Sequence, residues 1–106
     1  MDASWVPLLT TPPYPEYVSG YSGVTGAFTR SLQKTLGTRD LDVTLHSSAV
    51  PGAERHYDRA GALNNAVINA RIWLGIHFRS ADVDGVKMGQ RAANWVLNHA
   101  FLPAGG

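Results

Sequence analysis

Apolar residues recur every three or four positions between Ser19 and Leu36, and this spacing predicts a first helix over residues 19–36. Ser19 suits the N-cap position, and Gly37 suits the C-terminal stop. Three glycines inside the segment weaken the helix, and their repetition indicates a backbone that is closely approached, by a neighbouring helix or by an anion. The apolar stripe that we expect to face inward comprises Val24, Ala27, Phe28, Leu32 and Leu36.

The same spacing predicts two further helices, over residues 59–74 and 84–101. Asp58 could cap the earlier of these helices, and Asp82 or Asp84 could cap the later one. Each segment carries one apolar stripe, which is typical of helices packed on one side. The pattern therefore predicts three helices in all.

The connecting segments carry the proline and turn signals. Four prolines in residues 4–18 exclude a helix and favour an extended path. Residues 38–57 look irregular, with a short extended candidate at 42–45 and a turn at Pro51-Gly52. We therefore predict an all-α fold, a single domain over residues 1–106 that forms a half-bundle of about three helices with long ordered loops. The residues expected to anchor these segments to the core are Trp5, Leu8, Leu9, Tyr14, Trp73 and Trp95.

Composition narrows the classes of function. Only 16% of the residues are charged and 44% are apolar, so we expect some surface to be covered by a partner chain, a homo-oligomer or further chain. A net charge of +1 argues against nucleic-acid binding, and the absence of cysteine excludes disulfides and thiolate metal sites. With no apolar run of membrane-spanning length and no signal peptide visible, we expect a soluble protein of unknown compartment.

The stretch from residue 70 to residue 85 carries the most chemistry. Arg71 lies six residues before His77 in an apolar run, a spacing that separates the two side chains around a helix. Gly75 lies between them and can end the helix in the left-handed conformation, which would let both side chains converge. A guanidinium and an imidazole that converge suggest a bound oxyanion such as phosphate or vanadate. The commoner arrangement is an arginine paired with a carboxylate and a hydrogen-bonded core histidine, and this stretch alone favours it.

The start of the first predicted helix offers a second half of such a site. Ser19 and Gly20 follow the prolines and would present free N–H groups at the positive end of the helix dipole. Helix starts of this kind bind anions, although a plain capped start is the simpler interpretation of one Ser-Gly pair. Because two segments about fifty residues apart each offer half of an anion cradle, the combination predicts an oxyanion site.

These residues resemble a known family. The runs 5–21 and 70–82 look like the C-terminal part of the vanadium-dependent haloperoxidases, in the superfamily of type 2 phosphatidic acid phosphatases and bacterial acid phosphatases. The order of motifs is the same, from the proline-rich approach through the Ser-Gly helix start and the arginine to the histidine. The resemblance implies an all-α fold and a vanadate cofactor, with phosphate as the alternative occupant of the same site.

The resemblance also assigns roles to individual residues. It implies that Ser19 and Gly20 hold equatorial vanadate oxygens, that Arg71 neutralises their charge, and that His77 is the axial ligand to vanadium. In the phosphatase relatives the histidine that matches His77 is the nucleophile that forms a phosphohistidine. The absence of membrane spans and the Gly-Ile-His-Phe-Arg sequence look more like the soluble haloperoxidase branch.

Three departures from the family pattern bear on activity. Tyr21 replaces the histidine of the family's Ser-Gly-His, and a phenol with a pKa near 10 cannot exchange protons at neutral pH as an imidazole does. The family's lysine and Arg-Pro motif is absent. Asp82 falls one position later than the family's aspartate, although it could still orient His77 through the second ring nitrogen. We therefore expect reduced turnover, retained anion binding, and a chain that is a fragment, a half-domain completed by another chain, or a degenerate copy.

Three functions follow as alternatives. The first is a haloperoxidase-type enzyme that takes peroxide and halide, with His77 and Tyr21 in catalytic positions. The second is phosphomonoester hydrolysis through a phosphohistidine at His77. The third is a non-catalytic helical module for interaction or anion binding. Arg79 could be an additional oxyanion cation, although a solvated charge is the favoured interpretation. Surface or local hydrogen-bonding roles are expected for the histidines without metal-ligand spacing, His46, His56 and His99.

Overall fold

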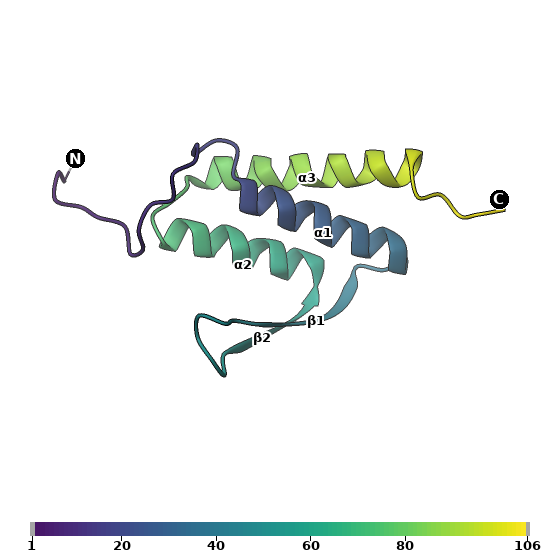
Figure 1. Ribbon diagram of the computed structural model, residues 1–106, viewed down its shortest axis with the longest axis horizontal. Helices are drawn as coiled ribbons and strands as arrows, with labels where there is room; N and C mark the ends of the chain where they lie inside the picture. The colour runs from purple at the N-terminus through teal and green to yellow at the C-terminus, as the bar shows by residue number, and fades with distance from the viewer. Residues whose placement is uncertain (1, 106) are drawn as a thin grey trace.

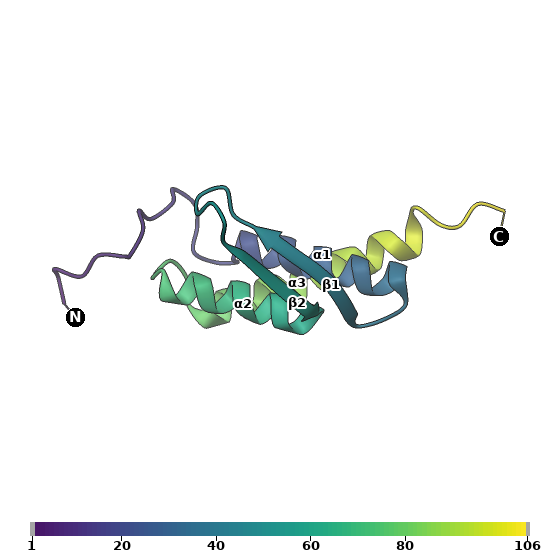
Figure 2. The same ribbon diagram turned by 90° about the horizontal axis from the view of Figure 1, so that it is seen from below.

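The computed structural model describes residues 2–105 and shows three helices and one β-hairpin (Figure 1). The middle of the three helical rods is the first in sequence, and the hairpin lies on the side of the second helix (Figures 1 and 2). None of the helices in this part of the chain combines the length and apolar character that crossing a bilayer requires. The elements are α1 (Gly20–Leu36), β1 (Asp40–His46), β2 (Glu54–Arg59), α2 (Ala60–Trp73) and α3 (Arg79–His99).

The hairpin corrects the all-α prediction. Strands β1 and β2 pair antiparallel, with Val43 opposite Tyr57 and a register irregularity between Asp40 and Val43. The extended candidate at 42–45 lies within β1, and the predicted turn is confirmed at Gly52, which has φ 82°. The pairing strand was missed because β2 has a single large apolar residue, Tyr57, and therefore shows almost no alternation.

Helices α1 and α3 approach each other through glycines. A Cβ atom added at Gly89 would lie 2.7 Å from the backbone nitrogen of Ala27, and one at Gly26 would lie 2.8 Å from the Cα of Val86. Contacts this short allow only glycine at both positions. Of the two interpretations of the α1 glycines, the neighbouring helix is therefore confirmed at Gly26. At Gly20 a Cβ would meet nothing within 4 Å, so that position is open.

The predicted inward stripe of α1 is wrong. Val24 is 72% exposed and Phe28 is 45% exposed, whereas the buried residues of α1 are Ser22, Gly23, Gly26 and Thr29. The close contact with α3 buries the small face of the helix and leaves the large apolar face outside. Trp73 and Trp95 are also exposed, so their predicted core roles are wrong, as are those of three residues near the N-terminus: Trp5, Leu8 and Leu9. Tyr14 is partly exposed but contacts the buried Arg71 and His77, so it does anchor the proline-rich segment. The partner chain or homo-oligomer expected to cover apolar surface stays a prediction.

Two of the three helices begin at residues other than those predicted. Ser19 is the N-cap of α1 as expected, but its side chain makes no capping hydrogen bond. The N-cap of α2 is Arg59, one residue after the predicted Asp58. Helix α3 begins at Arg79, five residues before the predicted start, after the N-cap Phe78. The early start places Asp82 inside the first turn, where it is fully buried against α1 instead of capping the helix.

Candidate functional site

The turn predicted at Gly75 is confirmed. Helix α2 ends at Trp73, and Gly75 follows with φ 75°, in the left-handed region that glycine favours. The amide of Gly75 donates to the carbonyl of Ile72 at 2.9 Å, and that of Ile76 donates to the carbonyl of Arg71 at 3.2 Å. The chain therefore turns back at once, and both Arg71 and His77 are buried.

Arg71 lies among aromatic side chains. Its Nη2 atom donates to the hydroxyl of Tyr14, and its guanidinium carbon lies 4.4 Å from the ring centroid of Tyr21, within cation–π range. Among residues 2–105 no carboxylate lies within ion-pair distance of Arg71, and its Nε atom is buried without a hydrogen-bond partner. The carboxylate-paired alternative is therefore wrong for this arginine. Its charge is uncompensated and adjoins the first turn of α1, which carries Tyr21.

His77 is buried and has no hydrogen bond. Its ring stacks on that of Tyr14, with 6.1 Å between centroids and 18° between planes. Its Nδ1 atom lies 3.6 Å from Oε1 of Glu16, which is longer than a hydrogen bond, and neither ring nitrogen has a hydrogen-bond partner. The alternative of a hydrogen-bonded core histidine is therefore wrong. Tyr14 touches both the arginine and the histidine, so it joins the two halves of the pair.

The start of α1 is held by a chain of hydroxyl groups. Ser19 is fully buried, and its Oγ donates to Oγ of Ser22 at 3.3 Å, which donates in turn to Oδ1 of Asp82 at 2.8 Å. The backbone N–H of Ser19 donates to the carbonyl of Ala81 at 3.2 Å. The side-chain O–H and the backbone N–H of Ser19 are therefore both engaged within the chain, and the predicted contact of Ser19 with an oxyanion stays a prediction. Gly20 remains the open position at this helix start.

Glu16 is the carboxylate beside His77, in place of the predicted Asp82. Asp82 accepts from Ser22 through Oδ1, while its Oδ2 atom is buried without a partner, and neither oxygen is hydrogen-bonded to His77. Glu16 lies beside the ring instead, and its Oε1 atom also accepts the N–H of Phe78 at 2.9 Å. Sequence reasoning did not identify Glu16, and it predicted Tyr14 only as an anchor, although the proline-rich segment leads directly into α1.

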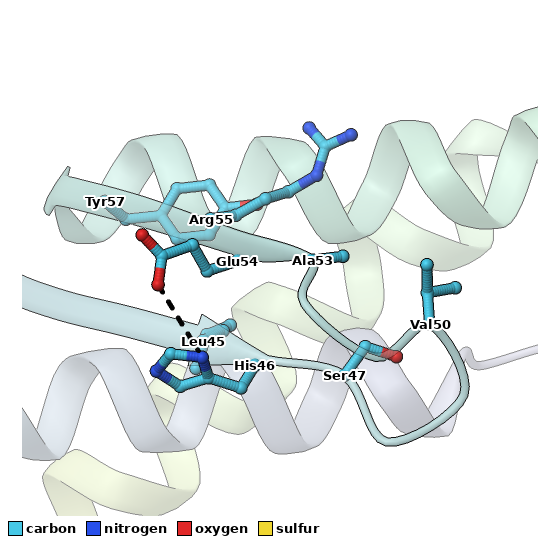
Figure 3. A pocket seen from close by; sticks show the side chains of 8 residues that line it. All are labelled: Leu45, His46, Ser47, Val50, Ala53, Glu54, Arg55 and Tyr57. Atoms are coloured by element: carbon cyan, nitrogen blue, oxygen red, sulfur yellow. Dashed lines mark ion pairs between the residues drawn. The ribbon is translucent and has the colours of Figure 1, made fainter.

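Two hollows in the structure differ in their chemistry. One of about 480 Å³ adjoins the site and is lined by Gly20 and by mainly apolar and aromatic side chains, including Tyr14 and Tyr21. Another of about 650 Å³ lies at the hairpin, where Figure 3 shows the exposed pair of His46 and Glu54, 3.8 Å apart. The hairpin hollow contains no buried unpaired cation. We therefore place the candidate site at Arg71 and His77.

The remaining histidines and Arg79 have local contacts. His56 lies 3.7 Å from Asp42 on the hairpin, and His99 approaches the carbonyl of Trp95 at 2.7 Å, so the expected surface or local roles are confirmed. Within residues 2–105 no three histidine or carboxylate side chains are grouped to hold a metal ion. Arg79 is exposed and donates to the side chain of Asn69. None of these residues contributes to the Arg71 site.

Fold and site together describe a helical-bundle domain in which a glycine-rich helix start lies beside a buried arginine and histidine. Residues 1–105 match the family model of the VCPO second helical-bundle domain, and the chain belongs to that family. No curated protein matches the chain.

Solved structures agree with this assignment. A bacterial vanadium-dependent iodoperoxidase shares 33% identity and a TM-score of 0.79 over 90% of this chain and 23% of its own. The apo form of a bacterial vanadium-dependent chloroperoxidase matches with TM-score 0.71 and 19% identity over 87% of this chain and 22% of its own. The holo form matches with TM-score 0.71 and 20% identity over 92% of this chain and 24% of its own. The chain thus spans less than a quarter of the length of these relatives, and the chloroperoxidases bear on the fold alone.

Proposed function

We propose that this chain contributes an oxyanion site for vanadate, or phosphate in its place, to a haloperoxidase-type protein that oxidises halide with peroxide. The observation that carries the proposal is the set of three buried nitrogens without hydrogen-bond partners, Nε of Arg71 and both ring nitrogens of His77. Each unsatisfied buried polar group costs about 1–3 kcal/mol, and more if charged. Such groups in a native structure call for an explanation, and an absent ion is a common one. Arg71 and His77 therefore fit an oxyanion, because both have buried nitrogens that lack a hydrogen-bond partner.

Each residue has a role that follows from its surroundings. Arg71 neutralises the anion, and His77 contacts it with the ring nitrogen remote from Glu16. The backbone N–H groups of Gly20 and Tyr21 belong to the first turn of α1, where no intrahelical acceptor exists, so they are the donors that replace the engaged hydroxyl of Ser19. Bound vanadate would supply Lewis-acid activation of peroxide. The residues of this chain would orient the vanadate and neutralise its charge.

Tyr21 favours a second candidate function, anion binding without turnover. Its ring covers the Arg71 guanidinium at 4.4 Å, at the position where the family pattern has a histidine. Tyr21→Ala should therefore leave anion binding intact or tighten it. Tyr21→His should confer bromide oxidation if the remaining groups suffice, and an inactive but vanadate-binding Tyr21→His protein would favour the non-catalytic module. Phosphomonoester hydrolysis is the enzymatic alternative, and trapping of a phosphohistidine at His77 would identify it.

Calorimetric titration with orthovanadate and inorganic phosphate tests the proposal directly. A charge-assisted hydrogen bond is worth about 1.5–3 kcal/mol, so Arg71→Ala should weaken binding by about 10- to 150-fold. Arg91→Ala is the matched control, because Arg91 is an exposed arginine of α3 and its loss should leave the affinity unchanged. Absence of binding in the unmodified chain, or equal affinities in all three proteins, would contradict the proposal.

A further inference from the structure

Glu16 is the carboxylate that faces His77, and it is fixed from two sides. Its Oε1 atom lies 3.6 Å from Nδ1 of His77 and accepts the backbone N–H of Phe78 at 2.9 Å. The side chain of His77 is 1% exposed, whereas that of Glu16 is 40% exposed. A half-solvated carboxylate therefore reaches a buried imidazole from the outside, along the proline-rich segment.

No other acceptor competes for this ring nitrogen among residues 2–105. Tyr14 presents its ring face to His77, and its hydroxyl is engaged by Arg71. Asp82 accepts from Ser22 across the contact between α1 and α3 and forms no ion pair with the ring. Glu16 is thus the one carboxylate within ion-pair distance of His77 in the described part of the chain.

We propose that Glu16 is a positioning residue, which accepts the Nδ1–H of His77 and so leaves the lone pair of Nε2 free for the central atom of the oxyanion. The contact between His77 and an anion rests on the proposed function, whereas the contact between Glu16 and the His77 ring does not. Imidazoles that contact a metal centre usually donate their other N–H to a carboxylate or carbonyl, which fixes the tautomer. The separation of 3.6 Å must shorten by about half an ångström to become a hydrogen bond, and contacts of this kind commonly tighten when the site fills.

The two contacts of Glu16 can be separated by substitution. Phe78 is the N-cap of α3, so the contact between Glu16 and the Phe78 N–H stabilises the start of that helix. Glu16→Gln keeps an oxygen that can accept this N–H and removes the charge. Glu16→Ala removes both. A purely structural role would make Glu16→Gln behave like the unmodified chain at His77.

Nitrogen-15 NMR of the histidine rings tests the proposal without any anion present. Spectra are recorded near pH 8.5, where an ordinary imidazole is neutral, and the His77 signals are assigned from their loss in His77→Asn. The Nδ1–H tautomer should predominate in the unmodified chain, decrease in Glu16→Gln, and become the minor form in Glu16→Ala. Glu54→Gln is the matched control, because it removes the same charge beside the exposed His46 and should leave His77 unchanged. An Nε2–H tautomer in the unmodified chain, or one tautomer population in all variants, would overturn the proposal.

Vanadate affinity then links this positioning to the site. Loss of a group that orients a metal-contacting histidine costs about 10- to 100-fold in affinity, which we expect for Glu16→Ala. If the unmodified chain binds no oxyanion and the tautomer still follows Glu16, the proposed function fails and the positioning role stands. If vanadate binds in an Arg71-dependent way while the Glu16 variants change neither tautomer nor affinity, the positioning role is refuted.

Discussion

Replacing Ser22 by alanine should lower the free energy of unfolding by about 2–3 kcal/mol. Ser22 donates to Oδ1 of Asp82 at 2.8 Å, and both residues are fully buried. A hydrogen bond to a charged group is worth about 1.5–3 kcal/mol. The expected loss lies near the upper end of this range, because Oδ2 of Asp82 already lacks a partner. The substitution would leave both carboxylate oxygens of Asp82 unpaired. For a domain of this size such a loss lowers the melting temperature by about 10–20 °C.

Urea denaturation followed by circular dichroism measures this loss. Ser80→Ala is the matched control, because Ser80 is an exposed serine in the first turn of α3 and should change stability by less than about 0.5 kcal/mol. Adding Asp82→Asn to Ser22→Ala should restore part of the stability, since a neutral amide costs less to bury than an unpaired carboxylate. A Ser22→Ala protein as stable as the control would refute the assignment of Asp82 to the contact between α1 and α3.

Two further predictions concern the same contact and the exposed tyrosine beside it. Gly89→Ala puts a methyl group 2.7 Å from the nitrogen of Ala27 and should lower the free energy of unfolding, measured thermally, by about 1–3 kcal/mol. Gly61→Ala is the control, because its methyl group would meet nothing within 4 Å and should be neutral or stabilising. Equal effects of the two substitutions would contradict the close packing of α1 and α3. The hydroxyl of Tyr17 donates to Asp84 at 3.0 Å, which raises the pKa of Tyr17 above its ordinary value of 10.0, so Asp84→Asn should lower the pKa seen by ultraviolet titration. Because the folded-state pKa is the higher one, this contact stabilises the fold below pH 10 and is lost as pH rises through the raised pKa; an unchanged Tyr17 titration would contradict it.

Local signals in the sequence were sufficient for the glycine turns that end α1 and α2 and for the start of α1. Gly37 and Gly75 both take the left-handed conformation expected of a glycine that ends a helix. Ser19 takes the N-cap position. Each of these features is decided by a residue's own backbone preferences and its nearest neighbours, so one sequence suffices to predict them.

The burial of α1 could not be predicted because this helix has two possible inner faces. Periodicity identifies a stripe of large apolar residues, but a stripe of serine and glycine occupies the opposite positions. The small stripe is buried because it lets α3 approach closely, as the contacts of Gly26 and Gly89 show. Nothing in the spacing of Val24 and Phe28 distinguishes a core face from an exposed one. Which face packs is set by the partner helix.

The candidate site also combines a local feature that could be predicted with long-range contacts that could not. The turn at Gly75, which lies between Arg71 and His77, depends on a local glycine preference and was predictable. Glu16 and Tyr14 contact partners 62 and 57 residues away, through Phe78 and Arg71, and the path of the proline-rich segment decides those contacts. Pattern and spacing hold no information about that path. Sequence therefore identified the cation and the imidazole but not the side chains that hold them.

We propose that the start of α1 and the turn after α2 bind one oxyanion together. Titration of the nitrogen-15 labelled chain with orthovanadate tests it most directly, by following the amides of Gly20 and Tyr21, the Nε–H of Arg71 and the ring of His77. We expect all four signals to shift together and to fit one dissociation constant, which Arg71→Ala should raise by about 10- to 150-fold. Shifts at Arg71 without any response at the α1 amides, or no shifts at all, would contradict it.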